Sequence, residues 1–565
     1  MAKAAPKKDP NALAEVAGSV YAGIMAVFTF VVLAVFPLYY HNYYFDILKA
    51  KYKFYWISVV VMAVICLIVA IVFLFVDRME YEGVNTKRFF SHFRPENLKK
   101  QPAAYKFLIL FIILASLSTI LSDYKFESFW GNEGRFSGLF LICLYALSVF
   151  MIGKFGKIKK WHLDLFLLAG VRACLFGITD YFRMDVLSWK EGVKSTQLDS
   201  FTSTLGNINT YTAYVALVMG VSCGFFVTEK NVLRNIWYYL VLLISFFAII
   251  TGQSDNAYLA LGALFALFPL VLFATRKGVI RYAVVIASFM SVIKVIDELN
   301  KKMAEKVIGL SGIFNMLAEH KYLEVIVIAL WLLVAVLYIG DRVMMKGKED
   351  KIGKWLRISW LCLIAAGAAA VIAVLYDANF GPNPEKYSSV SQYLIFNDSW
   401  GTNRGYCWRI GWESYMRLPL IHKLFGFGPD TFGILTWPFR QESLDIYGVY
   451  FESAHNEYFQ YLVTMGPFAT IAYILFLISS CARMMRFVKK QPWILAPLGA
   501  TVCAGVCQYQ PADSNTGYVG AFSSRPGDVQ RCAGKASAGN ALKFDIQKRT
   551  RIIRKVAGMI KCLKR

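Results

Sequence analysis

The segment FYWISVVVMAVICLIVAIVFLFV (54–76) carries no charged side chain along its whole length. A bilayer core is about 30 Å thick, and an α-helix needs roughly 20 apolar residues to cross it. The segment therefore predicts a membrane-spanning helix. Similar runs predict spans at 18–40, 54–76, 105–122, 137–153, 161–182, 207–227, 236–251, 257–275, 279–297, 322–340, 356–376 and 457–481, with a weaker thirteenth beginning near Trp493.

The composition agrees with these runs. Of the 565 residues, 57% are hydrophobic and 17% charged, and the mean hydropathy is +0.47. Soluble domains are about 45–50% apolar and about 25% charged. A net charge of +24 could indicate nucleic-acid binding, but the basic residues lie in short loops between apolar runs, as in membrane proteins. We expect an all-α polytopic integral membrane protein with about 12–13 transmembrane helices, a lipid bilayer as partner and no nucleic acid.

The loops between the predicted spans alternate in charge. Basic side chains concentrate in one set, and the positive-inside rule places that set in the cytoplasm. The N-terminal segment 1–17 then lies in the cytoplasm, and the transmembrane domain runs from 18 to 503. The segment 377–455 becomes a large extracytoplasmic loop. The basic set comprises 77–104, KFGKIKK (154–160), TRKGVIR (275–281), DRVMMKGKEDKIGKWLR (341–357) and ARMMRFVKK (482–490).

The eleven cysteines show no spacing typical of a disulfide framework or a metal site. Most of them lie inside apolar runs, so we expect no metal and no cofactor.

The loop 377–455 is long and rich in aromatic residues, which favours an ordered, functional segment. Within it, GYCWRIGWESYMRLPL (405–420) places Trp408, Trp412, Tyr415 and Met416 at helical spacing. This pattern predicts a short amphipathic helix on the membrane surface.

The chain changes character after Cys503. The apolar run gives way to a Gly/Ser-rich stretch and a basic end, DIQKRTRIIRKVAGMIKCLKR (545–565). One hypothesis is a reading-frame shift in the gene near codons 503–507, which would truncate the thirteenth span. The alternative is a genuine polar and basic tail over 504–565.

A polar cluster stands at the outer end of the span that begins near Glu457. Ser453 or Asn456 can cap that helix. The positive helix end disfavours imidazolium, so we expect His455 to be neutral and able to accept a proton. A capping cluster with an interfacial histidine is an equally good interpretation from these residues alone.

Two arginines of the same loop suit recognition of phosphate. Arg409 has Glu413 four positions later, and a helical ion pair between them is the likelier interpretation. Arg404 has no acidic residue three or four positions away, so this explanation is weaker for it.

Two further stretches mark outer ends of predicted spans. TSTLGNINTYTAY (202–214) contains Asn207 and Asn209, and FWGNEGRFSGLF (129–140) contains Arg135 and Gly138. Each stretch could be a helix cap. Together with His455 they suggest a shared outer cavity.

In this order, the motifs resemble those of the bacterial O-antigen ligase and O-antigen polymerase family, which is related to C-type glycosyltransferases. An R-x3-W helix corresponds to Arg404-GYC-Trp408. A PL-x-G-x-G-x-x-x-F turn corresponds to Pro419-Leu420 and GFGPDTF (426–432), and an H-[NS]-x-x-[LF]-Q motif to HNEYFQ (455–460). STLGNIN (203–209) and the Arg135 stretch resemble earlier family segments, so the likeness covers about 125–480.

The sequence also departs from the family pattern. Where many members carry an arginine beside a serine at the outer end of a middle span, this chain has Asp255 and Asn256. His422 and Lys423 are extra residues inside the Pro-to-Gly turn, and the last pair of spans looks truncated.

The resemblance implies a metal-independent, inverting enzyme in the bacterial plasma membrane. It would move a glycan from a polyprenyl diphosphate donor to an acceptor hydroxyl during cell-envelope polysaccharide biosynthesis, with undecaprenyl diphosphate as the carrier. Arg404 would stabilise the diphosphate and His455 would orient or deprotonate the hydroxyl. The residues that would bind substrate are Asn456, Gln460, Arg135, Asn207, Asn209 and Arg409.

Other functions stay open at this level. A ligase would use a lipid, protein or wall-polymer acceptor, whereas a polymerase would use another lipid-linked glycan. A transporter or flippase of lipid-linked glycans also suits about twelve spans, although the sequence shows few charges in the middle of spans and no clear repeat. An inactive remnant is a further alternative if the C-terminal change truncates the domain.

Overall fold

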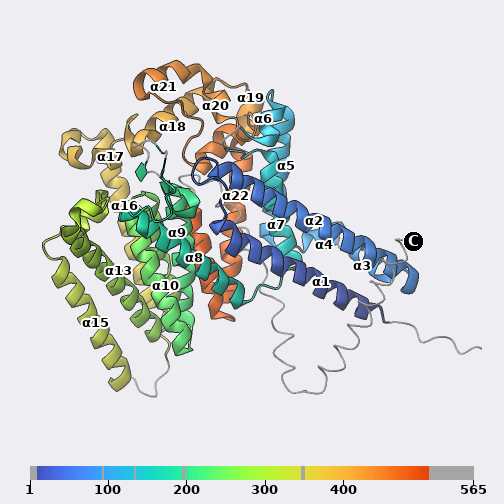
Figure 1. Ribbon diagram of the computed structural model, residues 1–565, viewed down its shortest axis with the longest axis horizontal. Coiled ribbons are helices and arrows are strands. Elements are labelled where there is room, and N and C mark those ends of the chain that lie inside the picture. Colours follow the sequence, from blue (N-terminus) through green and yellow to red (C-terminus); the bar gives the residue numbers. More distant parts are fainter. Residues whose placement is uncertain are drawn as a thin grey trace, which may run out of the picture.

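The computed structural model describes residues 9–507, apart from 92–93, 133–134, 192, 194–197, 200 and 345–349. The described chain is almost entirely helical (Figure 1). The longer apolar helices are α1 (Pro10–Phe30), α2 (Ile47–Glu80), α5 (Ala103–Leu121), α7 (Leu139–Phe155), α8 (Lys160–Tyr181), α9 (Ile208–Thr228), α10 (Val232–Thr251), α11 (Asn256–Leu267), α13 (Arg276–Lys302), α15 (Leu323–Met344), α16 (Trp355–Phe380), α22 (Glu457–Val488) and α23 (Leu495–Cys507).

The shorter elements lie between them. These are α3 (Val84–Ser91), α4 (Pro95–Lys99), α6 (Lys125–Trp130), α12 (Pro269–Leu272), α14 (Gly312–Ala318), α17 (Ser391–Leu394), α18 (Trp400–Arg417), α19 (Leu420–Phe425), α20 (Phe432–Leu435) and α21 (Arg440–Tyr447). A two-residue antiparallel pair, β1 (Phe201–Thr202) with β2 (Gly206–Asn207), precedes α9.

Ten helices of the described part are long and apolar enough to cross a membrane. The other expected spans, 137–153, 257–275 and the weaker thirteenth, correspond to shorter apolar helices at Leu139–Phe155, Asn256–Leu272 and Pro492–Gly505. The prediction of an all-α polytopic membrane protein is therefore confirmed.

The two ends of the predicted transmembrane domain need separate comment. The first helix begins at Pro10 with Asp9 as its cap, so its start lies before the expected boundary at residue 18. At the other end, α23 continues to Cys507. Residues 1–8 and the tail from 508 to 565 lie outside the described residues. The sequence that would follow the hypothesised frame shift belongs to that tail.

The core of the bundle is built around α9, which is buried along almost its whole length. Two glycines allow α23 to pack directly against it. A methyl group at Gly220 would lie 2.6 Å from the backbone nitrogen of Ala500, and one at Gly224 would lie 2.4 Å from the Cα of Ala496. The absence of a side chain at these two positions of α9 therefore sets the distance between the two helix backbones.

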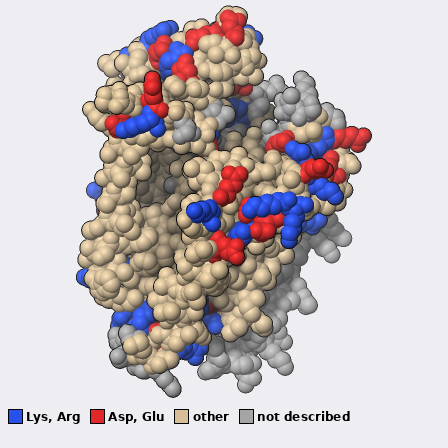
Figure 2. Space-filling model, turned by 90° about the vertical axis from the view of Figure 1, so that its left-hand side faces the viewer, with Lys and Arg blue, Asp and Glu red and all other residues tan. Residues whose placement is uncertain are grey.

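The outer helices of the bundle expose apolar side chains. Only 6% of the most apolar part of α15 is buried, and none of the corresponding part of α16. Figure 2 shows this side of the molecule, where uncharged surface is broad and charged side chains gather at the top, across the middle to the right and at the bottom. An exposed surface of this kind fits contact with lipid.

Three of the five basic loops that the sequence assigns to one side, 154–160, 275–281 and 341–357, lie close together, since Arg281 also donates to the Glu229 carbonyl at 3.0 Å. Thr275 and Lys351 form an isolated β-bridge, and Arg276 forms an ion pair with Asp341 at 2.8 Å. Lys160 lies 3.1 Å from Glu229 in a neighbouring loop at this end. These contacts agree with the alternating arrangement of the loops.

The segment between α16 and α22 lies at the opposite end and contains α17 to α21 (Figure 1). The predicted amphipathic helix is present as α18. Its aromatic stripe is divided: Tyr415 is buried and the indole of Trp408 bonds inward, whereas Trp412 and Met416 are exposed. The helix therefore packs on the protein with Trp408 and Tyr415, whereas Trp412 and Met416 stay exposed.

Candidate functional site

His455 stands immediately before the cap of α22, in a left-handed backbone conformation with φ of 49°. The residue before it, Ala454, is held at both of its peptide groups. The indole Nε1 of Trp408 donates to the Ala454 carbonyl at 2.9 Å, and the Ala454 N–H donates to Oε1 of Gln460 at 2.9 Å. Two motif residues from different helices thus fix the backbone that carries His455.

The capping interpretation of this cluster is also correct. Asn456 is the N-cap of α22, and its side chain accepts a hydrogen bond from the Phe459 N–H at 3.1 Å. The hydroxyl of Ser453 accepts from the His455 N–H at 3.3 Å. Asn456 and Gln460 therefore both make local structural contacts. These contacts do not prevent His455 from taking part in chemistry.

Two arginines lie near His455 and act on its charge. Burial, together with the positive charges of Arg135 and Arg404, lowers the pKa of His455 to about 4. A neutral imidazole was expected from the positive helix end, and burial and these two guanidinium groups act in the same direction. The imidazole is therefore uncharged at neutral pH, and it is a weaker base than an ordinary histidine.

Arg404 is buried in α18 and forms an ion pair with Asp255, with its Nη1 3.2 Å from the carboxylate Oδ2. Asp255 immediately precedes α11. The departure from the family pattern in this stretch thus has a structural counterpart: the middle span supplies the partner of Arg404 instead of a second arginine.

The two asparagines of the 202–214 stretch are joined to the same place. Asn207 caps α9 by accepting from the Asn209 N–H at 2.8 Å. The side-chain oxygen of Asn209 accepts from the Ser254 hydroxyl at 2.8 Å, next to Asp255. This stretch therefore helps to hold the segment that carries the partner of Arg404.

Arg135 is placed by a contact that the sequence did not reveal. The carboxylate of Asp430 accepts from the N–H groups of Asn132 at 2.8 Å and Ser137 at 3.1 Å, on either side of Arg135. Asp430 belongs to the turn quoted as GFGPDTF. That turn was recognised as a motif, but its partner is far away in sequence.

The same turn docks on a break in α22. The helix is interrupted at Gly466, where φ is 80°, just before Pro467. The N–H groups of Phe427 and Gly428 both donate to the Thr464 carbonyl at 2.8 Å. The break frees that carbonyl, so the turn is tied to α22 and to the Arg135 segment at once.

Arg409 does not join the cluster. Its guanidinium contacts the carboxylates of Asp398 at 3.0 Å, Glu413 at 3.3 Å and Glu442 at 2.5 Å. The ion pair with Glu413 that its spacing predicted is present. These three carboxylates join Arg409 to α21 and to the residues around α18, so we leave it out of the proposed cluster.

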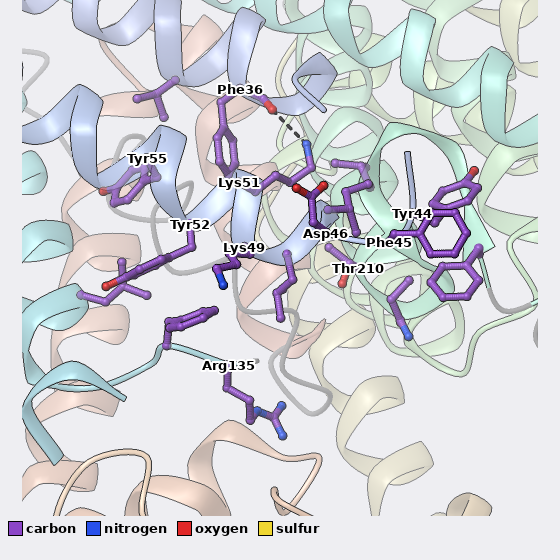
Figure 3. Close-up of a pocket in the computed structure, with 18 of the residues that line it drawn as sticks. Phe36, Tyr44, Phe45, Asp46, Lys49, Lys51, Tyr52, Tyr55, Arg135 and Thr210 are labelled. Atoms are coloured by element: carbon purple, nitrogen blue, oxygen red, sulfur yellow. Dashed lines mark hydrogen bonds between the residues drawn. The ribbon is translucent and has the colours of Figure 1, made fainter. Parts of the chain in front are cut away.

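A cavity of about 420 Å³ lies beside this cluster (Figure 3). It is formed by the connection between α1 and α2, the start of α2, the segment 135–145 that leads into α7, and the segment 201–210. Arg135 and Asn207 line it, so two of the three outer ends that we expected to share a cavity meet there, whereas His455 is not among its lining residues. The α1–α2 connection, which supplies many of its aromatic side chains, was not singled out from sequence.

No group of three or more His, Cys, Asp or Glu side chains converges as a metal site within the described ranges. Cys407 lies near the two arginines, but burial raises the pKa of its thiol to about 12. It is therefore uncharged at neutral pH and is a poor nucleophile.

None of the models of known protein families matches the chain, and neither does any of the curated proteins compared with it. The geometry of His455, Arg135, Arg404 and Asp255 therefore carries the functional argument together with the motif resemblance.

Proposed function

We propose that the chain is a glycosyltransferase of the O-antigen ligase type. It transfers a glycan from a polyprenyl diphosphate lipid to an acceptor hydroxyl on the extracytoplasmic face of the bacterial plasma membrane. One observation carries the proposal: a neutral histidine is held beside two arginines at the end of the bundle opposite the basic loops.

The three side chains supply the groups that this reaction needs. An uncharged imidazole at His455 can accept the proton of an attacking hydroxyl. The guanidinium groups of Arg404 and Arg135 can stabilise the negative charge that develops on the departing diphosphate. His455 takes up the proton of the acceptor hydroxyl. The glycosyl–phosphate bond breaks as the new glycosidic bond forms, and the lipid diphosphate leaves. These steps do not require a metal.

The fixed backbone at Ala454 supports this assignment. A general base must hold its geometry to within a fraction of an ångström. Hydrogen bonds from Trp408 and to Gln460 constrain the residue before His455 on both of its peptide groups. A histidine that served only as an interfacial residue would not need such support.

The experiment is complementation of a deletion strain with wild type, His455→Ala or Arg404→Gln, at matched membrane levels. We expect deletion to leave glycan on the lipid carrier, and His455→Ala to restore transfer about 10²–10⁴-fold more slowly than wild type. Arg409→Gln, outside the cluster, is the comparison for non-specific effects on the loop.

The possible outcomes separate the alternatives. Full rescue by His455→Ala would reject the mechanism, and the cluster around His455 would then serve only to cap α22. Product that contains repeated glycan units, without attachment to another acceptor, would indicate the polymerase. Glycan that stays on the inner leaflet after deletion would indicate the flippase.

A further inference from the structure

A cavity adjoins the candidate site at Arg135, and the proposed chemistry gives no role to the rest of its lining. Its walls are mainly apolar and aromatic. Its volume of about 420 Å³ falls in the range of sites that enclose part of a small ligand. The apolar wall includes Val32, Phe36, Tyr52, Leu141, Tyr145 and Leu205.

One rim of the cavity faces the surroundings of the bundle. Phe45 and Leu48 line it and are 60% and 41% exposed. Both flank the start of α2, a helix whose most apolar part is only 17% buried. This rim of the cavity therefore lies next to the exposed apolar surface of α2.

The polar groups of the cavity are not equivalent. Lys51 is fixed by the carbonyls of Phe36, Pro37 and Tyr39 at 3.0, 3.2 and 2.9 Å. The carboxylate of Asp46 accepts from the Asn42 N–H at 2.9 Å and lies 2.8 Å from the His41 imidazole. Both are held by the connection between α1 and α2.

Lys49 and Arg135 come from different elements and lie on the same side of the cavity, whereas Lys51 points away from them (Figure 3). Two cations at one end of an apolar cavity suit an amphiphile with an anionic headgroup. Since Arg135 also acts electrostatically on His455, this end adjoins the cluster.

We propose that the cavity holds the first isoprene units of the donor's polyprenyl chain, with the diphosphate at Lys49 and Arg135. This inference rests on the proposed function, which supplies the identity of the lipid. The cavity then sets the depth of the lipid, so that the bond to be broken lies between Arg135, Arg404 and His455.

The test is a binding titration of the purified full-length chain in detergent, followed by native mass spectrometry. The probes are undecaprenyl diphosphate, undecaprenol, inorganic diphosphate and phosphatidylglycerol. Leu141→Trp fills the cavity. Ile244→Trp is the matched control, because Ile244 lines a separate apolar depression of about 290 Å³ between α8, α10 and α13.

We expect undecaprenyl diphosphate to bind more tightly than the other three probes. Leu141→Trp should weaken it by about tenfold, the effect of leaving roughly two methylene groups in water, while Ile244→Trp leaves it unchanged. Lys49→Gln should weaken undecaprenyl diphosphate but not undecaprenol. If Leu141→Trp does not fold, a photoreactive residue at Leu48, but not at Ile244, should cross-link the isoprenoid chain.

Three results would overturn the inference. Equal effects of the two tryptophan variants would place the chain outside the cavity. Phosphatidylglycerol binding as tightly as the isoprenoid, and equally sensitive to Leu141→Trp, would make it a pocket for bilayer lipid. If inorganic diphosphate displaces undecaprenyl diphosphate completely, and Leu141→Trp does not change the affinity, the site binds the anion only.

Transfer measured in the same samples separates this inference from the proposed function. Cavity-dependent binding without any glycan transfer would reject the glycosyltransferase and keep the lipid site. Transfer that depends on His455 but is unchanged in Leu141→Trp would keep the enzyme and reject the cavity.

Discussion

The guanidinium of Arg404 lies 3.2 Å from the carboxylate of Asp255, although 149 positions separate the two residues in the chain. The pair joins the extramembrane helix α18 to the start of α11, in the centre of the candidate site. The arginine assigned to the diphosphate therefore already has an anionic partner, with which the substrate must share or compete.

Competition with Asp255 predicts the behaviour of Asp255→Asn. Removing the carboxylate leaves Arg404 more available to phosphate, so the KM for the lipid diphosphate should fall by about tenfold. Steady-state kinetics with purified enzyme measure this change. The control is Asp398→Asn, which removes a carboxylate from Arg409, outside the cluster. A higher KM in Asp255→Asn would instead show that Asp255 holds Arg404 in position.

The low pKa of His455 predicts an unusual dependence of activity on pH. A base loses activity as the pH falls through its pKa, so the wild type should remain active down to about pH 4. An ordinary histidine would lose activity near pH 6.5. Arg135→Gln removes one repulsive charge, so the pKa should rise and the acidic limb of kcat/KM should move towards neutral pH.

The comparison for this profile is Arg417→Gln, since Arg417 lies on the same helix as Arg404 but is exposed and pairs with Glu413 at 3.5 Å. Its profile should match that of the wild type. An acidic limb near pH 6.5 in the wild type would contradict the burial of His455 and the effect of the two arginines.

The sequence predicts the spans well because the signal is local. The run at 54–76 must be a helix in a bilayer, since no other open structure satisfies its backbone. The contacts of Asn456 with Phe459 and of Arg409 with Glu413 are equally local. Spacings of three and four residues determine them.

The site depends on contacts that no local pattern encodes. Asp255 is 149 positions from Arg404, and Asp430 is 298 positions from Asn132. The cavity likewise needs α1, α2 and α7 to be packed together before it exists. The three polar outer ends of the predicted spans, and the ordered motifs through their family resemblance, pointed to these regions as one site.

The support of Ala454 predicts the effect of Gln460→Leu. The substitution keeps the size of the side chain but removes the acceptor for the Ala454 N–H, so His455 should lose its fixed orientation. We expect kcat to fall about tenfold with little change in KM, because a positioning contact has been lost rather than a substrate contact. Gln441→Leu, at an exposed position of α21, is the matched control. A change confined to KM would assign Gln460 to sugar binding.

The contact between α9 and α23 predicts a stability difference between two identical substitutions. Gly224→Ala places a methyl group 2.4 Å from the Cα of Ala496, which cannot move without shifting α23. We expect a loss of about 1–3 kcal/mol and a lower thermal midpoint in detergent. Gly262→Ala in α11 meets no atom within 4 Å, so it should be neutral or stabilising by up to about 1 kcal/mol. Equal midpoints for the two variants would mean that α23 is not packed against α9 at this distance.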